Sequence, residues 1–403
     1  MISVTKLLGG PSFYGDRLRY AETSGQARQG TAVGSGPVVV WNATKTCNLE
    51  CVHCYADAGK SKFTGELTTA EAIALIDDLA TINVPALLMS GGEPLVRPDI
   101  IDLATYAIQE KGIRVTFSTN GTLINEKVAK RLADIGVTYC GISIDGAEAD
   151  HDRMRAKVGA FKDAVRGIRN CRAAGIRVGI RFTVTSENAP DLDSIFRLVE
   201  DEDIGRLCIY HLVYSGRGAY LSGIDVPNPR KRVFMDKLIR QVDRWNAEKR
   251  DIEVMTVDNH ADGPFIYLWL LENDSERAPY ARDLVMRNGG NRTGVAIGAI
   301  DSFGFVHPDQ FTQHHIVGNI RERKFSEIWT DPHAPLLEGL RNRKEKIRGR
   351  CATCKWLPCC NGNFRARAEG AFSDYWESDP ACYLTDQEIA SGVAESRGRE
   401  VAQ

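Results

Sequence analysis

The sequence predicts an α/β protein in which a partial (β/α)6 barrel of the TIM type is followed by a small α+β auxiliary domain. Between residues 36 and 225, short apolar runs alternate six times with longer segments of helical periodicity. Such alternation predicts parallel strands joined by crossover helices. Beyond residue 225 longer amphipathic helices appear, and cysteines gather near the C-terminus. We therefore divide the chain into an N-terminal extension (1–35), the barrel (36–225), a helical connection (226–290) and the auxiliary domain (291–403).

The first elements surround a cysteine-rich segment. Residues 1 to about 35 are polar and rich in glycine, and GQARQGTAVGSGP (25–37) reads as a loop. PVVVWN (37–42) is a short run of the buried strand type, and it leads directly into KTCNLECVHCY (45–55). The following segment (68–82) has helical periodicity, with Thr68 or Thr69 as the expected N-cap.

Five further strands and four further helices continue the alternation. The predicted strands lie at 86–92, 113–121, 138–146, 177–188 and 206–218. The predicted helices between them lie at 98–112, 125–136, 161–175 and 191–204. Parallel barrels carry their chemistry at the carboxyl ends of the strands, so we expect the cysteine segment at that rim.

The second half of the chain has a different pattern. Amphipathic helices are predicted at 231–250 and 265–286, with an extended polar segment (254–264) between them. Residues 288–311 read as a glycine-bounded β-hairpin, and 318–331 as a turn with a short helix.

Composition restricts the class of protein. A chain of 403 residues can bury a substantial core in two or three domains. Its net charge of −2 lacks the basic surplus typical of nucleic-acid binding. We find neither a run of about 18 apolar residues, which a membrane span needs, nor a signal peptide. We therefore expect a cytoplasmic protein without nucleic-acid or membrane partners, in which eleven cysteines favour metal binding over disulfides.

The first cysteine group has C-x3-C-x2-C spacing within one short loop and consists of Cys47, Cys51 and Cys54. A [4Fe–4S] cluster is commonly held by four cysteines, so three leave one iron open for another molecule. A structural zinc ion completed by His53 is the alternative, but it does not explain the later features of the chain.

The second cysteine group comprises Cys351, Cys354, Cys359, Cys360 and Cys382. Four of these could hold a complete second [4Fe–4S] cluster, and the adjacent Cys359 and Cys360 compete for one position. Zinc is again the alternative, because C-x2-C with two further cysteines also suits a tetrahedral ion.

These features resemble the radical S-adenosylmethionine (SAM) family, whose signature is the three-cysteine loop followed by a GGEP segment such as 91–94. More selective stretches, including YHLVYSGRG, TVDNHADGP, GNFRARAEG and DPACYLTD, resemble its tetrapyrrole-modifying branch with a C-terminal SPASM extension. Within that branch the chain is most similar to the 12,18-didecarboxysiroheme deacetylases of siroheme-dependent heme biosynthesis. A sister family of heme d1 biosynthesis shares several of the same stretches.

The resemblance implies the residues that bind SAM. The cluster held by Cys47, Cys51 and Cys54 takes part in catalysis, and SAM completes its open iron. Candidates for contact with SAM follow the second to fourth strands: Gly91, Gly92, Glu93, Ser118, Asn120, Ser143 and Asp145. The glycines are expected to admit the ligand, although GGEP alone would read equally as a tight turn. Arg181 is expected either to pair with the SAM carboxylate or to form a structural salt bridge.

The resemblance also implies an auxiliary [4Fe–4S] cluster on Cys351, Cys354, Cys360 and Cys382. Cys360 is preferred to Cys359 because Cys360-Asn-Gly-Asn matches the C-G-G-N step of the family. The predicted hairpin has no cysteine, so we expect one auxiliary cluster and two [4Fe–4S] clusters in all.

The implied reaction removes two acetate side chains from 12,18-didecarboxysiroheme to give Fe-coproporphyrin III. A low-potential donor such as ferredoxin or flavodoxin reduces the first cluster, and SAM then yields a 5′-deoxyadenosyl radical that abstracts hydrogen. The alternatives are a heme d1 enzyme that replaces propionate side chains of the same precursor, a SPASM peptide maturase, and a non-enzymatic electron carrier or heme-binding protein.

An iron tetrapyrrole presents carboxylates and a metal. Carboxylates call for arginine, and the candidates in loop-like segments are Arg217, Arg292, Arg365 and Arg367. The iron calls for imidazole, and the candidates are His211, His260, His307, His314 and His315. His260 is the first choice, because Gly263 and Pro264 predict a rigid loop around it, and His307 and His314 are the alternatives. Each residue could instead be a surface charge or a structural histidine.

Overall fold

The computed structural model describes residues 1–21 and 27–392 and contains one curved sheet of eleven strands, in the order β1-β8-β7-β6-β5-β4-β3-β2-β9-β10-β11. The strands are Ile2–Ser3 (β1), Val38–Asn42 (β2), Leu87–Ser90 (β3), Val115–Thr119 (β4), Tyr139–Ser143 (β5), Arg177–Val184 (β6), Arg206–His211 (β7), Glu253–Val257 (β8), Ile297–Ile300 (β9), Phe305–His307 (β10) and Gly318–Asn319 (β11). All neighbours from β2 to β8 are parallel. The predicted partial barrel is therefore confirmed, and β8 adds a seventh parallel strand to it.

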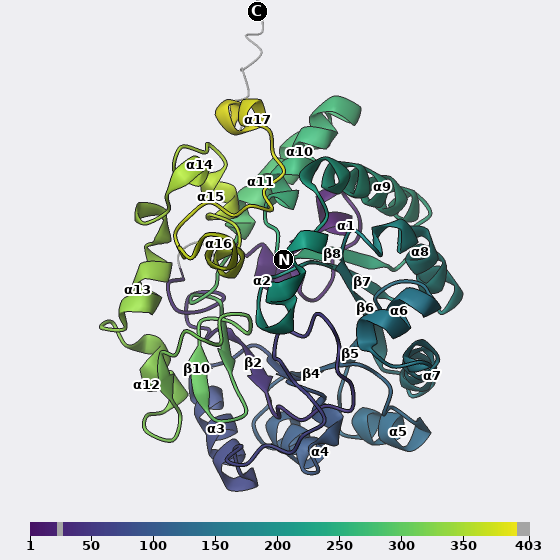
Figure 1. The fold of residues 1–403 in the computed structure, drawn as a ribbon, viewed down its shortest axis with the longest axis vertical. Helices are drawn as coiled ribbons and strands as arrows, with labels where there is room; N and C mark the ends of the chain where they lie inside the picture. Colours follow the sequence, from purple (N-terminus) through teal and green to yellow (C-terminus); the bar gives the residue numbers. More distant parts are fainter. Residues whose placement is uncertain (22–26, 393–403) are drawn as a thin grey trace, which may run out of the picture.

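The α-helices that the structure describes pack around this curved sheet, most of them on its outside. In the first half they are Val4–Leu7 (α1), Asp16–Arg19 (α2), Thr69–Thr81 (α3), Ile100–Thr105 (α4), Glu126–Asp134 (α5), Glu148–Arg155 (α6), Ala160–Ala173 (α7) and Leu192–Asp201 (α8). In the second half they are Asn228–Ala247 (α9), Asp262–Asn273 (α10), Ala278–Asn288 (α11), Phe325–Thr330 (α12), Pro335–Arg341 (α13), Gly349–Ala352 (α14), Leu357–Cys360 (α15), Arg365–Phe372 (α16) and Asp386–Ser391 (α17). Figure 1 shows α3 to α9 outside the arc of strands and the auxiliary helices α12 to α16 along its open side.

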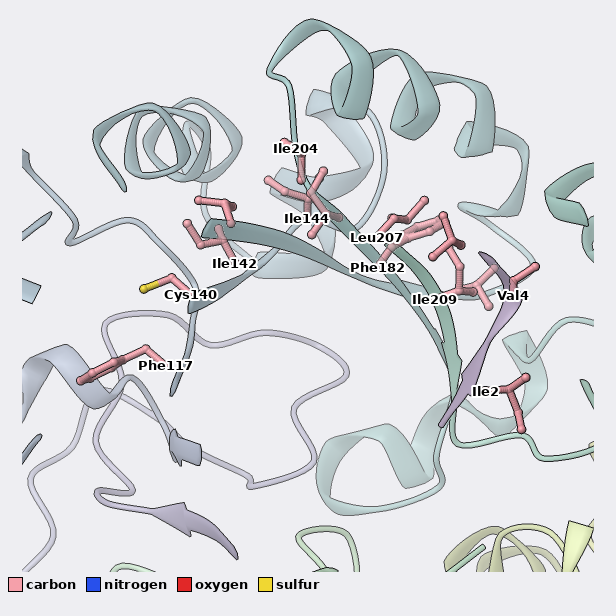
Figure 2. Close-up of a cluster of buried hydrophobic side chains, with 14 of the residues drawn as sticks. Ile2, Val4, Phe117, Cys140, Ile142, Ile144, Phe182, Ile204, Leu207 and Ile209 are labelled. Atoms are coloured by element: carbon pink, nitrogen blue, oxygen red, sulfur yellow. The ribbon is translucent and has the colours of Figure 1, made fainter. Parts of the chain in front are cut away.

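Alternation along the strands separates the core from the barrel interior. Ile180 and Phe182 of β6 are fully buried, whereas Arg181 between them lines the interior. Figure 2 shows Ile142, Phe182 and Leu207 between the strands and the helices that cover them. Local signals also hold: Thr68 caps α3 in a reciprocal capping box with Glu71.

The first residues of the N-terminal extension, for which the sequence predicted no element, form a strand and a short helix. β1 pairs with β8 in antiparallel register, and α1 follows it directly. Ile2, Val4 and Leu7 are almost fully buried. The reason is nonlocal, because their apolar surface is covered by elements more than two hundred residues later. Residues 22–26, which overlap the start of the predicted loop, lie outside the described residues.

The segment 254–264, predicted to be extended and polar, contains a buried strand and the start of a helix. Its first half is β8, whose residues are all buried, and Asp262 begins α10. The buried Glu253 is tolerated because Arg19 and Arg206 both contact its carboxylate. Gly263 and Pro264 belong to the first turn of α10 rather than to a rigid loop around His260. The predicted helix over 265–286 is likewise two helices, α10 and α11.

The sheet continues into the predicted auxiliary domain. β9 and β10 form the expected hairpin, and β9 also pairs in parallel with β2. The domain boundaries at residues 225 and 290 stay predictions, because β8 within the helical connection and β9 after it both extend the barrel sheet, at its opposite ends.

Candidate functional site

The cysteine loop follows β2 and is held by the GGEP segment. The backbone N–H of Gly92 donates to Thr44 O at 2.7 Å, and that of Glu93 donates to Thr46 O at 3.0 Å. A Cβ atom on Gly92 would lie 2.2 Å from Thr46 O. In this structure the glycine is required by the close approach of the loop itself.

Glu93 connects the ends of β3 and β4. Its carboxylate accepts hydrogen bonds from the Thr119 hydroxyl and the Asn120 N–H, both at 2.8 Å, and from the Leu95 N–H at 3.2 Å. Burial raises the pKa of Glu93 to about 7, although these hydrogen bonds oppose the shift. The carboxylate is thus used within the protein, and it fixes the position of Asn120.

The thiols of the loop lie in a largely apolar setting with a few donors. Asn120 Nδ2 lies 3.9 Å from Cys47 Sγ, and Arg155 Nη1 lies 3.5 Å from Cys51 Sγ. Burial raises the pKa of Cys47 to about 12, so this group is a thiol until a metal displaces its proton. Donors aimed at sulfur stabilise the thiolates that an iron–sulfur cluster requires.

Asp145 is occupied by internal partners. Its Oδ2 lies 2.5 Å from Arg155 Nη2 and 3.4 Å from His53 Nε2, and its Oδ1 accepts from the Thr183 N–H at 3.1 Å. Burial opposes ionisation of Asp145, but Arg155 and His53 outweigh it and lower the pKa. Sequence reasoning missed Arg155, because nothing in α6 marks it as a neighbour of the cysteine loop.

The spacing of the sulfurs does not support zinc in either cysteine group. A tetrahedral zinc–thiolate site needs sulfur atoms about 3.8 Å apart, whereas each cysteine of a cubane binds a different iron and stands farther from the others. Across residues 1–21 and 27–392, which include every cysteine, the only three His, Cys, Asp or Glu ligand atoms within 4.8 Å of one another belong to His314, His315 and Glu369. No described cysteine is in a disulfide.

A cavity of about 280 Å³ occupies the barrel interior next to the cysteine loop. Tyr55, adjacent to Cys54, lines it and hydrogen-bonds Asn42 at 3.1 Å and Ser90 at 3.2 Å. Four predicted site residues also line it: Ser118, Arg181, His260 and Arg292. Asn120 and Ser143 are at the ends of β4 and β5, outside the cavity lining.

The cavity contains arginines of two kinds. Arg19 and Arg206 are neutralised by Glu253. Among the described residues Arg292 donates to backbone carbonyls alone, including Gly30 O at 2.8 Å, and burial lowers its pKa to about 10. Arg181 stacks on Tyr210 at 4.5 Å. Within the described chain neither Arg292 nor Arg181 has a carboxylate partner, so both are available to an anionic ligand.

His260 is the one candidate histidine that lines the cavity. Its backbone N–H donates to Asn363 Oδ1 at 2.6 Å, and its Nε2 lies 3.1 Å from the nitrogen of Met1. Its Nδ1 is buried without a hydrogen-bond partner in the described structure. Burial lowers the pKa of His260, and a neutral imidazole is the form that binds iron.

The other candidate histidines lie elsewhere. His211 pairs with the buried Asp262 at 3.0 Å. His307 Nδ1 lies 3.1 Å from His315 O, and His314 and His315 both contact Glu369. The structure therefore does not bring His307 or His314 to the cavity.

The remaining candidate arginines have structural contacts. Arg217 holds the cysteine loop, with Nε 2.8 Å from Cys51 O and Nη1 2.8 Å from Asp57. Arg365 and Arg367 are buried rather than exposed. Arg365 donates to Tyr375 O, and Arg367 forms a bidentate pair with Asp379.

Asp258 is a cavity residue that sequence reasoning left without a role. It lines the cavity, is only 6% exposed, and its Oδ2 has no partner among the described residues. Its φ of 66° is unusual for a residue with a side chain, and Arg367 Nη2 holds its carbonyl at 2.6 Å. Burial raises the pKa of Asp258 to about 7.

Four cysteines of the second group share a smaller cavity. Cys351, Cys354, Cys360 and Cys382 line it, together with Asn363 and Asp379. Cys359 does not, and its Sγ lies 3.1 Å from Met286 Sδ. The donor set fits a [4Fe–4S] cluster that is fully ligated by protein.

Residues 258–261 separate the two cavities. Asp258 and His260 line the barrel cavity, and Ala261 lines the cysteine cavity. Asn363 Nδ2 donates to Asn259 Oδ1 at 2.7 Å, which ties this segment to the cysteine-bearing region. The barrel cavity and the cavity of the second cysteine group are thus neighbours.

Family models match both parts of the chain. The Radical SAM superfamily matches residues 41–199, and an iron-sulfur cluster-binding domain named SPASM matches residues 297–355. Within the part that the structure describes, no helix has the length and apolar character needed to cross a membrane.

Curated relatives match nearly end to end. The chain is 47% identical to "Fe-coproporphyrin III synthase" of Methanosarcina barkeri, over 96% of this chain and 99% of that protein. It is 40% identical to "Pre-heme d1 synthase" of Dinoroseobacter shibae, over 95% and 94% of the two chains.

Solved structures share the fold. Streptococcus suis SuiB bound to the precursor peptide SuiA superposes with a TM-score of 0.66 at 16% identity, covering 86% of this chain and 76% of that one. Native anSMEcpe with bound AdoMet and a peptide gives 0.64 at 18% identity, covering 88% and 95%. At these identities the likeness shows architecture alone.

Proposed function

Because the chain belongs to the radical SAM family and carries a C-terminal SPASM domain, we propose that it removes the two acetate side chains of 12,18-didecarboxysiroheme to give Fe-coproporphyrin III. The relative that is 47% identical bears the name of a synthase of this product. The proposed setting is the cytoplasm, with ferredoxin or flavodoxin as the electron donor.

The observation that carries this proposal is the pairing of unneutralised arginines with an unpartnered imidazole in one cavity. Arg181 and Arg292 offer guanidinium groups to substrate carboxylates. His260 offers Nδ1 to a metal at the substrate centre. A flat, polycarboxylated iron tetrapyrrole needs both kinds of contact.

Cys47, Cys51 and Cys54 would hold the first cluster, and Cys351, Cys354, Cys360 and Cys382 the auxiliary one. When bound, the first cluster supplies the electron that cleaves SAM, and SAM supplies the hydrogen-abstracting radical. The protein's own residues provide the setting. Tyr55 and Ser90 place the cysteine loop against the cavity, and the mostly apolar cavity walls disfavour water around the reacting groups.

Turnover is the direct test. Reconstituted protein, supplied with SAM, a low-potential reductant and didecarboxysiroheme under anaerobic conditions, should release 5′-deoxyadenosine and a product with the mass of Fe-coproporphyrin III. SAM cleavage with unchanged substrate would reject the substrate assignment while leaving the radical SAM chemistry in place.

A heme d1 enzyme is the second candidate, because the 40% identical relative bears the name of a pre-heme d1 synthase. The same experiment separates the two functions, since that reaction changes the propionate side chains and leaves the acetates. A product that retains both acetates would favour it.

Binding of the product offers an independent test of the cavity residues. Fe-coproporphyrin III added to the wild type should give a Soret band typical of imidazole ligation, and His260→Ala should lose it. His307→Ala and His314→Ala are matched controls that should keep the wild-type spectrum, because neither residue lines the cavity. Arg292→Gln should weaken binding roughly 10- to 100-fold, the range for a lost hydrogen bond to a charged group. An unchanged spectrum in His260→Ala would reject this residue as the axial ligand.

A further inference from the structure

Two adjacent histidines and a glutamate meet outside both cavities, where the loop after β10 passes α16. Nε2 of His314 lies 2.8 Å from Oε2 of Glu369, and Nε2 of His315 lies 3.0 Å from both carboxylate oxygens. Neither histidine lines the barrel cavity. The proposed reaction therefore leaves this triad without a role.

The spacing of the triad agrees with coordination of one ion. Nitrogen and oxygen ligands about 2.1 Å from a zinc-sized ion lie about 3.0 Å apart at right angles and about 3.4 Å apart in a tetrahedron. The nitrogen–oxygen separations of 2.8 and 3.0 Å are close to the lower value. Two imidazoles with one carboxylate are also the donor set of three-ligand zinc and iron(II) sites that keep positions open for water.

The surroundings fix two of the three ligands and leave the third accessible. The His315 ring packs edge-on against Tyr375 at a centroid distance of 4.9 Å, and its backbone N–H donates to Thr312 O at 2.9 Å. Glu369 lies on α16, which is held through the buried Arg365 and Arg367. The His314 side chain is 59% exposed, so an ion can reach the site from solvent.

We propose that His314, His315 and Glu369 bind one divalent transition ion of the zinc or iron(II) type, separate from both iron–sulfur clusters. The ion would tie the loop that carries Asp309 and Phe311, both of which line the barrel cavity, to α16 of the auxiliary domain. This inference does not depend on the identity of the tetrapyrrole. Hydrogen bonds alone would also bring these groups together, so the experiment has to distinguish a metal-binding triad from a triad that is only hydrogen-bonded.

Metal analysis makes that separation. Protein with both clusters reconstituted is equilibrated anaerobically with Zn²⁺, passed through a desalting column and analysed for zinc and iron. The wild type should retain about one zinc per chain more than Glu369→Gln, at equal iron content. His314→Ala, which changes an exposed side chain, should lose the same zinc. His333→Ala is the matched control, because His333 is an exposed histidine outside the triad.

Thermal unfolding gives a second readout. Zn²⁺ should raise the melting temperature of the wild type and of His333→Ala by about 2 °C or more, because an ion that binds only the native state stabilises it. It should not raise that of Glu369→Gln or His314→Ala. Equal zinc retention in the wild type and in both triad variants would overturn the proposal. A lower melting temperature of Glu369→Gln without any zinc effect would then identify a hydrogen-bonded triad only.

Discussion

Cys359 and Cys360 are neighbours in the sequence but lie in different surroundings. The Cys360 side chain faces Cys351, Cys354 and Cys382 in the small cavity, whereas Cys359 packs against Met286. The turn of α15 between them directs the two thiols apart.

We predict opposite results for the two cysteines. Cys360→Ala should lower the iron content from about eight to about four per chain, because one thiolate of the auxiliary cluster is removed. Cys359→Ala should keep about eight, since it changes only an apolar contact. Iron and sulfide analysis after anaerobic reconstitution measures both. The reverse pattern would exchange the assignments of the two residues.

His151 predicts a dependence of stability on pH. Its Nδ1 accepts the Asp145 N–H at 3.0 Å, and burial together with Arg155 lowers its pKa from 6.5 to about 4. Below pH 6.5 His151 binds a proton in the unfolded chain but stays neutral in the folded chain. The free energy of unfolding should therefore decrease as the pH is lowered from 6.5 to about 4. The expected loss is about 1.5 kcal/mol between pH 6.5 and 5, because the slope rises to about 1.4 kcal/mol per unit only once the unfolded histidine is fully protonated.

The matched variant is His151→Asn, which keeps an acceptor near the position of Nδ1 but does not titrate. Urea unfolding between pH 7.5 and 5 should show a shallower decline for this variant than for the wild type. Parallel declines would mean that His151 does not contribute to the acid sensitivity.

At the scale of elements, the GGEP segment packs directly against the cysteine loop. Gly92→Ala would place a Cβ atom 2.2 Å from Thr46 O, which forces the loop away from β3. We predict that this variant loses the first cluster and SAM cleavage but keeps the auxiliary cluster, so that iron falls to about four per chain.

Gly223→Ala is the control for this substitution, because no heavy atom lies within 4 Å of the position that its Cβ atom would take, and no left-handed φ is required there. It should retain both clusters and wild-type 5′-deoxyadenosine formation. If Gly92→Ala also retains them, the loop tolerates displacement and the glycine serves another purpose.

The sequence could predict those features that depend on residues close together in the chain, and it missed those that depend on distant partners. The cysteine groups, the helix cap at Thr68 and the six strands depend on nearby residues, and local patterns revealed them. β8 did not read as a strand, because Glu253 is acceptable in a buried sheet only beside Arg19 and Arg206. Asp258 and Arg155 were missed for the same reason, since their significance comes from cavities and partners that only the folded chain brings together.

At the scale of the whole molecule, the two cysteine groups lie in different places: the first follows β2, and the second lines the small cavity next to Ala261. Each cluster should therefore form without the other. We predict that replacing Cys47, Cys51 and Cys54 by alanine abolishes 5′-deoxyadenosine formation and leaves about four irons in the auxiliary site. Reconstitution followed by iron analysis and chromatography of SAM products measures both outcomes.

The wild type serves as the reference, with about eight irons per chain expected. Retained SAM cleavage in the triple variant would show that the open iron lies elsewhere. Complete loss of iron would instead show that the auxiliary site depends on the barrel.

The arrangement of the sheet also has a consequence for synthesis of the protein on the ribosome. β1 obtains its partner only when β8 has emerged, and β2 keeps a free parallel edge until β9 arrives. The ends of the barrel are thus completed by residues made late, and pairings of such long sequence separation fold slowly. Nascent chains that end before residue 297 should therefore expose the unpaired edge of β2, a hydrophobic strand beside the cysteine loop. The risk of aggregation during synthesis should be greatest before β9 emerges.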